Sequence, residues 1–185
     1  MTAEETILSG YSKAIIKKAA QIKVLAFDVD GVLTDGKIIY SSSGAELKAF
    51  NVRDGLIISH LKKAGLITGI ISGRESAAVT RRAVELKLDF CHQGIEDKAW
   101  AFAQILKHHK LKAKQVCFIG DDINDLPVFD QAGLRICPAD APPYLHNMVD
   151  LVTSSKGGRG VIREVSELLL AASGGFNKIL KTVRK

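Results

Sequence analysis

Short apolar runs alternate with amphipathic stretches along most of the 185-residue chain. Helical spacing of apolar residues predicts helices, and continuous apolar runs predict buried strands. Strands that alternate with helices in this way form a mostly parallel sheet covered by helices on both faces, so we expect a Rossmann-like α/β fold. The expected strands are Val24–Phe27, Thr68–Ile71, Leu88–Cys91, Val116–Ile119, Leu134–Cys137 and Leu151–Val152. The expected helices are Gly55–Ala64, Ser76–Leu86, Asp97–His109, Asp125–Gln131 and Val161–Ala172.

One interval breaks the alternation, directly after the first strand. Lys37–Tyr40 and Ala45–Phe50 are two short extended segments around a Ser/Gly turn, which predicts an inserted β-hairpin. Before the first strand, a spaced set of apolar residues indicates one amphipathic helix: Ile7, Leu8, Tyr11, Ile15 and Ile22. We expect a helical extension over residues 1–22, an α/β domain over 23–173 and a basic tail, as a peripheral helix, over 174–185.

The net charge of +6 resides in the two ends of the chain. Residues 1–23 carry +2 and residues 174–185 carry +4, so the segment between them is neutral. No aromatic-basic stripe accompanies these ends, so we expect no nucleic-acid partner. The sequence shows neither a membrane span nor a signal peptide, so we expect no membrane partner. Three widely spaced cysteines (Cys91, Cys117 and Cys137) indicate buried thiols in the reducing cytoplasm.

The segment Asp28-Val29-Asp30-Gly31 closes the first apolar run. In an extended chain, side chains two residues apart point to the same side, which brings the two carboxylates together. Two such anions repel each other unless a cation lies between them or one of them takes a proton. The motif therefore indicates a divalent metal with a reactive and a proton-handling carboxylate, although an Asp-rich turn or a helix cap would have the same composition.

Polar residues also follow the other strands. Ser72-Gly73-Arg74 follows the second strand, Gly120–Asp125 follows the fourth, and Lys98 opens the intervening helix. In an open parallel sheet, ligands bind beyond the carboxyl ends of the strands, so these loops converge. Three carboxylates in the six residues of Gly120–Asp125 exceed what a helix cap requires. The loops therefore predict one site.

In this order the four segments resemble the haloacid dehalogenase superfamily of aspartate-nucleophile phosphatases, over residues 24–173. The resemblance implies that Asp28 attacks phosphorus and that Asp30 donates and then accepts a proton. It implies that Ser72 binds a phosphoryl oxygen and that Lys98 offsets negative charge. It also implies Mg²⁺, held by the Asp28 carboxylate, the Asp30 carbonyl oxygen and Asp121. Whether Asp122 and Asp125 touch the metal or orient its surroundings stays open.

Many relatives in this superfamily carry a cap domain in one of two places. Here only 42 positions separate Asp30 from Ser72, and 26 separate Ser72 from Lys98, so neither interval has room for a cap. A capless site is open to water, which suits a small substrate poorly. We expect either a macromolecular substrate or neighbouring subunits that cover the site.

Finer motifs favour neighbouring subunits. Asn51–Gly55, Arg74, Arg82 and Gly157–Gly160 are similar to the family of 3-deoxy-D-manno-octulosonate 8-phosphate phosphatases. The resemblance implies a capless homotetramer of lipopolysaccharide biosynthesis that acts on a phosphorylated sugar acid. It implies that the Gly-rich segment with Arg159 reaches an active site, its own or a neighbour's. The substrate-binding residues it implies are Asp30, Asn51, Val52, Arg53, Asp54, Gly55, Arg74, Arg82, Lys98 and Arg159.

One departure bears on the substrate. Members of this family often have Arg where this chain has Ser59, so a substrate contact is lost or supplied otherwise. The closest alternative is a phosphatase for a nine-carbon 2-keto-3-deoxy sugar acid, which Arg53 and Arg74 disfavour. A non-catalytic, phosphatase-like oligomerisation module is an alternative of another class, which the presence of Asp28, Lys98 and Asp121 disfavours. The five histidines show no spacing that indicates a metal site.

Overall fold

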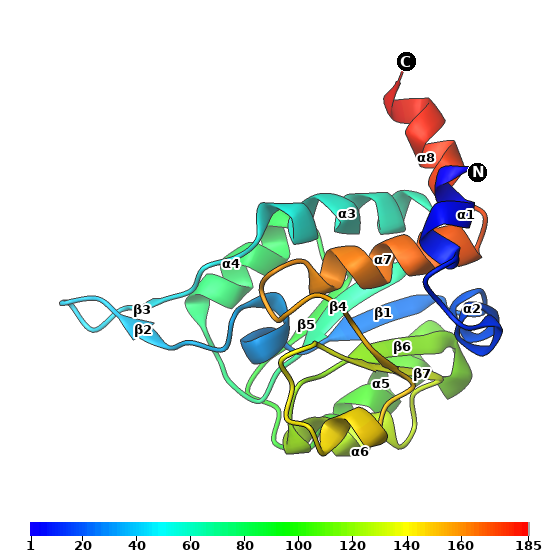
Figure 1. Ribbon diagram of the computed structural model, residues 1–185. Helices are drawn as coiled ribbons and strands as arrows, with labels where there is room; N and C mark the ends of the chain where they lie inside the picture. The colour runs from blue at the N-terminus through cyan, green and yellow to red at the C-terminus, as the bar shows by residue number, and fades with distance from the viewer. Residues whose placement is uncertain (185) are drawn as a thin grey trace.

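The computed structural model of the chain describes residues 1–184 and contains one six-stranded sheet (Figure 1). Its strand order is β5–β4–β1–β6–β7–β8, and every neighbouring pair is parallel. The strands are β1 Val24–Phe27, β4 Ile67–Ile71, β5 Phe90–His92, β6 Val116–Ile119, β7 Leu134–Cys137 and β8 Leu151–Val152. The expected parallel sheet is confirmed.

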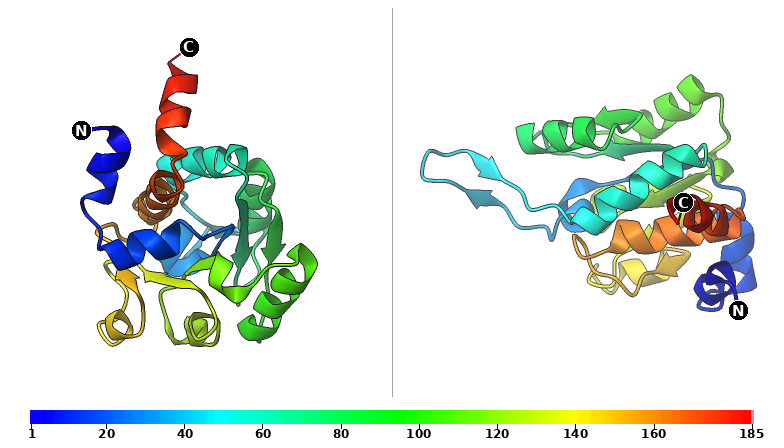
Figure 2. Two further views of the ribbon diagram at one scale, coloured as in Figure 1. Left: turned by 90° about the vertical axis from the view of Figure 1, so that its right-hand side faces the viewer. Right: turned by 90° about the horizontal axis from the view of Figure 1, so that it is seen from above.

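Helices cover both faces of the sheet (Figures 1 and 2). One face is covered by α2 Lys13–Ala19, α3 Val52–Lys63, α4 Ala77–Glu85 and α7 Val161–Ala172, and α1 Ala3–Leu8 and α8 Phe176–Val183 pack on α7. The other face packs against α5 Lys98–His109 and α6 Leu126–Phe129. Strand β1 supplies both cores, because Leu25 and Phe27 face the first layer while Val24 and Ala26 face the second. Buried on both sides, β1 is a continuous apolar run.

The expected hairpin is present and projects from the body of the molecule (Figures 1 and 2). It consists of β2 Ile39–Tyr40 and β3 Glu46–Leu47, which pair antiparallel with Ile39 opposite Leu47. Only the turn Val29–Leu33, the hairpin and α3 lie between β1 and β4, and only α4 and β5 lie between β4 and α5. The absence of a cap domain from the described residues 1–184 is therefore confirmed.

Two helix predictions need correction. The N-terminal segment forms two short helices, because the chain turns at Gly10 and Ser12 caps α2 by accepting a hydrogen bond from the Ile15 N–H at 3.3 Å. Helix α3 begins at Val52 instead of Gly55, because the Asn51 side chain caps it by accepting the Arg53 N–H at 2.9 Å. The Asn51–Gly55 motif is therefore a helix start.

Smaller shifts occur at α6 and β5. Helix α6 is one turn, Leu126–Phe129, and a short 3₁₀ turn over Ile123–Asp125 precedes it. Strand β5 starts two residues later than expected, because Lys87 adopts a left-handed φ of 53° and the Leu88 N–H still bonds to Ala83 of α4.

The division of the chain at residues 22 and 173 stays a prediction. Within residues 1–184, every helix is too short or too polar to cross a membrane.

Candidate active site

The sheet brings three loops together at the carboxyl end of its central strand. Strand β1 lies between β4 and β6, with Phe27 paired to Ile70 on one side and to Ile119 on the other. Asp28, directly after β1, therefore has the loop after β4 and the loop after β6 as neighbours. Because of this register, Ser72 and Asp121 line the same pocket as Asp28.

The loop Asp28–Gly36 follows β1, and we call it the catalytic loop. Its turn requires glycine at position 31. Gly31 adopts a φ of 83°, which disfavours any side chain. A Cβ atom there would lie 1.8 Å from the Asp121 Oδ2 atom. The Gly-rich segment packs on the same loop, because a Cβ on Gly157 would lie 1.9 Å from the Gly31 carbonyl oxygen, and the Gly158 N–H donates to Val32 at 2.8 Å. This segment thus supports the catalytic loop of its own chain.

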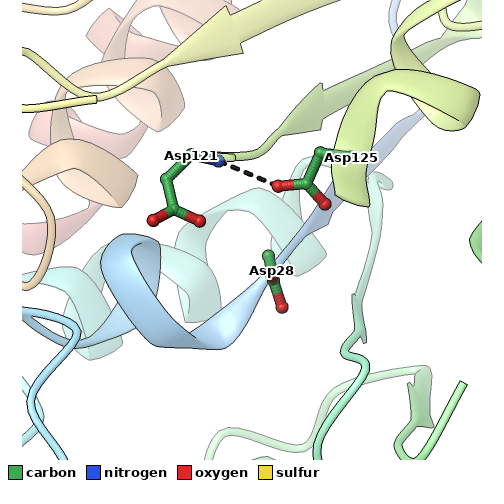
Figure 3. A group of neighbouring side chains, drawn as sticks. All are labelled: Asp28, Asp121 and Asp125. Atoms are coloured by element: carbon green, nitrogen blue, oxygen red, sulfur yellow. Dashed lines mark hydrogen bonds between the residues drawn. The ribbon is translucent and has the colours of Figure 1, made fainter. Parts of the chain in front are cut away.

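Three carboxylates lie at the centre of the site (Figure 3). Asp28, Asp121 and Asp125 each place one oxygen within 4.8 Å of the others. Both oxygens of Asp125 have protein partners: Oδ1 accepts from the Lys98 ammonium at 2.6 Å and Oδ2 from the Asp121 N–H at 2.9 Å. Asp125 is fully buried, whereas Asp28 and Asp121 line the pocket. Asp125 therefore orients the Lys98 ammonium and the Asp121 backbone in this structure.

Lys98 lies beneath this cluster at the start of α5. Its side chain is 2% exposed and its ammonium also donates to Asp28 Oδ2 at 2.8 Å. Burial alone would lower the pKa of Lys98, but the charges of Asp28 and Asp125 outweigh burial and raise it. Lys98 is therefore a fixed positive charge behind Asp28.

The single positive charge of Lys98 does not balance the three carboxylates of the cluster, Asp28, Asp121 and Asp125. Burial and the nearby charges of Asp28 and Asp125 raise the pKa of Asp121 to about 8. Oxygen ligands with surplus negative charge are what Mg²⁺ prefers. The residues fit a divalent cation, which Asp28, Asp121 and the Asp30 carbonyl oxygen would hold.

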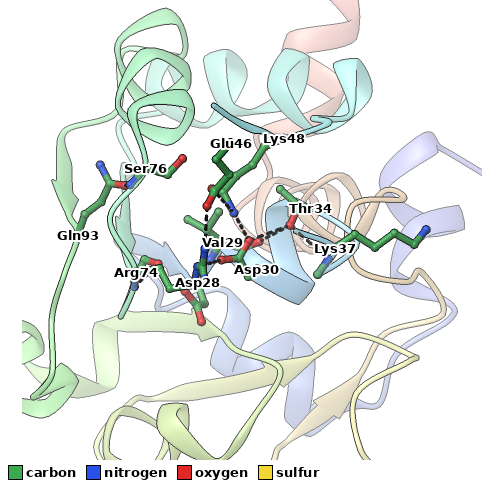
Figure 4. A network of polar contacts seen from close by, with 12 residues as sticks. Asp28, Val29, Asp30, Thr34, Lys37, Glu46, Lys48, Arg74, Ser76 and Gln93 are labelled. Atoms are coloured by element: carbon green, nitrogen blue, oxygen red, sulfur yellow. Dashed lines mark hydrogen bonds and ion pairs between the residues drawn. The ribbon is translucent and has the colours of Figure 1, made fainter. Parts of the chain in front are cut away.

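Asp30 lies at the edge of the site within a network of charged side chains (Figure 4). Its Oδ1 atom is 2.5 Å from the Lys48 Nζ and its Oδ2 atom is 3.4 Å from the Arg74 Nε. Glu46 pairs with both cations, at 3.1 Å from Lys48 and 2.7 Å from Arg74. Lys48 and Glu46 were absent from the predicted site, because nothing in the sequence shows that the base of the hairpin folds back onto Asp30.

The pocket has a volume of about 250 Å³. Ser72 is 3% exposed and its Oγ accepts the Arg74 N–H at 3.4 Å, which fixes the hydroxyl at the pocket wall. Tyr144, which the sequence did not indicate, donates to Asp122 Oδ1 at 2.8 Å from a neighbouring loop. The lining residues are Asp28, Asp30, Gly36, Ser72, Gly73, Arg74, Asp121, Asp122 and Asn124.

The remaining predicted substrate residues lie outside this pocket. Asn51 and Arg159 line an adjoining hollow of about 330 Å³, which also includes Asp35. They line a second hollow of about 400 Å³ together with Arg53. Asp35 is the chain neighbour of Gly36, which lines the first pocket. These hollows therefore extend from the catalytic loop across the Gly-rich segment.

Three members of the Asn51–Gly55 group and Arg82 occupy structural or exposed positions within this chain. Asp54 is fully buried and caps α7 by accepting the Gly160 N–H at 3.3 Å and the Arg163 N–H at 2.8 Å. Gly55 leaves room for Arg82, whose guanidinium lies 5.6 Å from the centre of the Phe50 ring. Val52 is 79% exposed. Their predicted contacts with substrate stay predictions.

The fold and the carboxylate cluster define a haloacid dehalogenase-like hydrolase, and that family matches residues 87–165. The 3-deoxy-D-manno-octulosonate 8-phosphate phosphatase KdsC of Escherichia coli strain K12 is 42% identical over 90% of this chain and 89% of the relative. The corresponding Yersinia pestis enzyme is 44% identical over 85% of this chain and 84% of the relative. The chain therefore belongs to the 3-deoxy-D-manno-octulosonate 8-phosphate phosphatase family.

Solved structures agree. The phosphatase from Moraxella catarrhalis, in complex with magnesium ion, phosphate ion and 3-deoxy-D-manno-octulosonate (KDO), has a TM-score of 0.90 and 41% identity. The match covers 94% of this chain and 99% of that chain. The structure of the Yersinia pestis enzyme has a TM-score of 0.89 and 41% identity, and the match covers 90% of both chains.

Proposed function

We propose that this chain hydrolyses 3-deoxy-D-manno-octulosonate 8-phosphate to the free sugar acid and phosphate, with Mg²⁺, in lipopolysaccharide biosynthesis. The observation that carries the proposal is the convergence of Asp28, Ser72 and Asp121 on one pocket, with Lys98 buried behind Asp28, in a chain of this family. The crystal structure of the Moraxella relative with magnesium, phosphate and KDO supports the choice of metal and substrate.

The pocket suits a two-step hydrolysis. Asp28 attacks phosphorus and forms an aspartyl-phosphate, while Asp30 protonates the leaving alkoxide. Water then cleaves the intermediate, with Asp30 as the base. Ser72 donates to a phosphoryl oxygen, and the buried ammonium of Lys98 offsets charge on Asp28 and the phosphoryl group. Asp28, Asp121 and the Asp30 carbonyl oxygen would hold Mg²⁺, which would supply further positive charge for the phosphoryl group.

Arginines bind the acid end of the substrate in this proposal. Arg74 lines the pocket and is 45% exposed, so its guanidinium can exchange its pairing with Glu46 for a carboxylate of the substrate. Arg159 and Asn51 line the adjoining hollow, and Arg53 shares the second hollow with them, so both hollows extend the pocket towards these groups. Arg82 would need a change of rotamer or a neighbouring subunit to take part, because it packs on Phe50 and Gly55.

The assembly that we propose is a homotetramer in the cytoplasm. The hairpin exposes apolar side chains that a soluble monomer would rarely present: Ile38 at 45%, Ile39 at 47%, Tyr40 at 64% and Leu47 at 51%. Contact between hairpins would bury these residues, and neighbouring chains would cover the capless pocket. The catalytic unit comprises residues 23–173, with residues 1–22 and 174–185 as its extension and tail.

The test is phosphate release with Mg²⁺ across phosphorylated sugar acids and common sugar phosphates. We expect the eight-carbon 8-phosphate to give the highest kcat/KM. Preference for the nine-carbon 9-phosphate would agree with the proposed hydrolytic mechanism but contradict the proposed eight-carbon substrate. Absence of turnover with every compound would overturn the proposal in favour of a non-catalytic module.

A further inference from the structure

Lys48 is a buried cation at the base of an exposed hairpin. Its side chain is 1% exposed, although Leu47 beside it is 51% exposed. Burial of an ammonium group is unfavourable unless anions surround it. Lys48 satisfies this requirement by contacting Asp30 at 2.5 Å and Glu46 at 3.1 Å (Figure 4). The hairpin therefore places a fixed charge against the edge of the active site.

The two carboxylate oxygens of Asp30 contact different cations, the buried Lys48 and the more exposed Arg74. Lys48 contacts its Oδ1 atom from a buried position, and the Thr34 hydroxyl donates to the same oxygen at 3.4 Å. Arg74 contacts the Oδ2 atom through its Nε at 3.4 Å and is 45% exposed. A long contact from an exposed side chain is more easily exchanged than a short contact from a buried one. The Oδ2 atom is therefore the oxygen that can be released to the substrate.

We propose that Lys48 is a positioning residue for the proton donor, which holds Oδ1 of Asp30 so that Oδ2 faces the substrate. When Arg74 turns to the carboxylate of the substrate, Oδ2 is free to carry the proton. In the first step the O–H bond at Oδ2 breaks as the bond between phosphorus and the leaving oxygen breaks, and the proton passes to that oxygen. This inference rests on the proposed role of Asp30 as the acid.

Glu46 joins the two cations. Its carboxylate pairs with Lys48 through Oε1 and with Arg74 through Oε2, and these two partners with Ser76 lower the pKa of Glu46, Lys48 most of all. Glu46 and Lys48 both belong to the hairpin, so the hairpin carries the group that anchors Asp30 and the group that restrains Arg74. The position of the hairpin thus determines whether Asp30 is aimed at the pocket.

The test compares substrates whose leaving groups differ in their need for a proton. The leaving oxygen of a sugar phosphate is a strongly basic alkoxide, whereas p-nitrophenolate departs unprotonated. Because kcat/KM includes every step up to loss of the leaving group, it reports the acid role of Asp30. For Lys48→Met we expect kcat/KM to fall roughly 10- to 100-fold with the sugar acid phosphate and less than about threefold with p-nitrophenyl phosphate.

Lys48→Arg, which keeps the charge, is expected to restore most of the loss with the sugar acid phosphate. Lys37→Met is the matched control, because Lys37 is 68% exposed and pairs with Asp35 in the neighbouring loop. If Lys48→Met fails to fold, as judged by circular dichroism, Lys48→Gln is measured in its place. Equal losses on both substrates would contradict the positioning role.

Asp30→Asn separates this inference from the proposed function. We expect Asp30→Asn to lose more kcat/KM on the sugar acid phosphate than on the aryl phosphate. Equal losses for Asp30→Asn would overturn the acid assignment itself. A selective loss for Asp30→Asn together with an unselective loss for the Lys48 variant would overturn only the role of Lys48.

Discussion

The ammonium group of Lys98 lies 2.8 Å from the carboxylate of Asp28, at the buried end of the central strand. Lys98 contacts Asp125 as well, at 2.6 Å, so one cation serves two buried acids. The pair is held by elements far apart in the chain, β1 and the start of α5. Because the pair is buried, removal of either side chain would leave the charge of the other without compensation.

Lys98→Met should impair both chemistry and stability. Loss of the charge behind Asp28 should lower turnover roughly 100-fold or more. It also leaves Asp28 and Asp125 without their cation, which should lower the free energy of unfolding in EDTA by about 3 kcal/mol. Mg²⁺ should restore part of that stability. The control is Lys62→Met, which breaks an exposed pair with Asp89 and should cost less than about 1 kcal/mol. Equal thermal shifts for the two variants would contradict this account.

The raised pKa of Asp121 predicts how stability depends on pH. In the folded metal-free protein Asp121 holds a proton up to a pKa of about 8, whereas in the unfolded chain it releases that proton near its ordinary pKa of 3.8. Between these values the unfolded state binds fewer protons, so the free energy of unfolding falls as pH rises. In EDTA we expect a loss of about 4 kcal/mol between pH 5 and pH 8.

Two comparisons check this pH dependence by denaturant unfolding. Asp121→Asn cannot release the proton, so it should flatten the decline in EDTA and be more stable than the unaltered chain at pH 8. Mg²⁺ should flatten the decline in the unaltered chain, because the cation replaces the proton. A decline that persists in Asp121→Asn would assign the effect to other groups.

Alanine substitutions at Gly31 and Gly44 distinguish the cost of backbone strain from the cost of a steric clash. Both have positive φ, at 83° and 82°. A Cβ on Gly44 meets nothing within 4 Å, whereas a Cβ on Gly31 would lie 1.8 Å from Asp121. Gly44→Ala should therefore cost about 1–2 kcal/mol of stability and leave kcat unchanged. Gly31→Ala should cost more and reduce kcat roughly 100-fold or more, because Asp121 is displaced. Unchanged kcat in Gly31→Ala would show that the position of Asp121 is unimportant.

Much of the site could be predicted because the parallel sheet orders it. Asp28, Ser72 and Asp121 each follow an apolar strand, so the strand order alone brings them together. Lys48 could not be predicted, since its contact with Asp30 depends on how the hairpin folds back. The start of α3 at Val52 was missed because a side-chain cap decided it, which periodicity does not detect.

The exposed apolar face of the hairpin predicts how the chain assembles. Replacing Tyr40 and Leu47 together by Ser should dissociate the proposed homotetramer and lower turnover of the sugar acid phosphate, because neighbouring chains no longer cover the pocket. Val84→Ser on α4 is the control, since Val84 is also exposed, at 72%. Light scattering measures the mass. An unaltered mass in the Tyr40 and Leu47 variant would place the interface elsewhere.

The central claim is that Asp28 becomes phosphorylated during turnover. The most direct measurement is rapid acid quenching of the enzyme with Mg²⁺ and the 8-phosphate, followed by mass spectrometry of its peptides. We expect a phosphoryl group on the peptide that contains Asp28, formed and lost within one turnover, and none in Asp28→Asn. A phosphoryl group on another residue, or turnover retained by Asp28→Asn, would contradict the account.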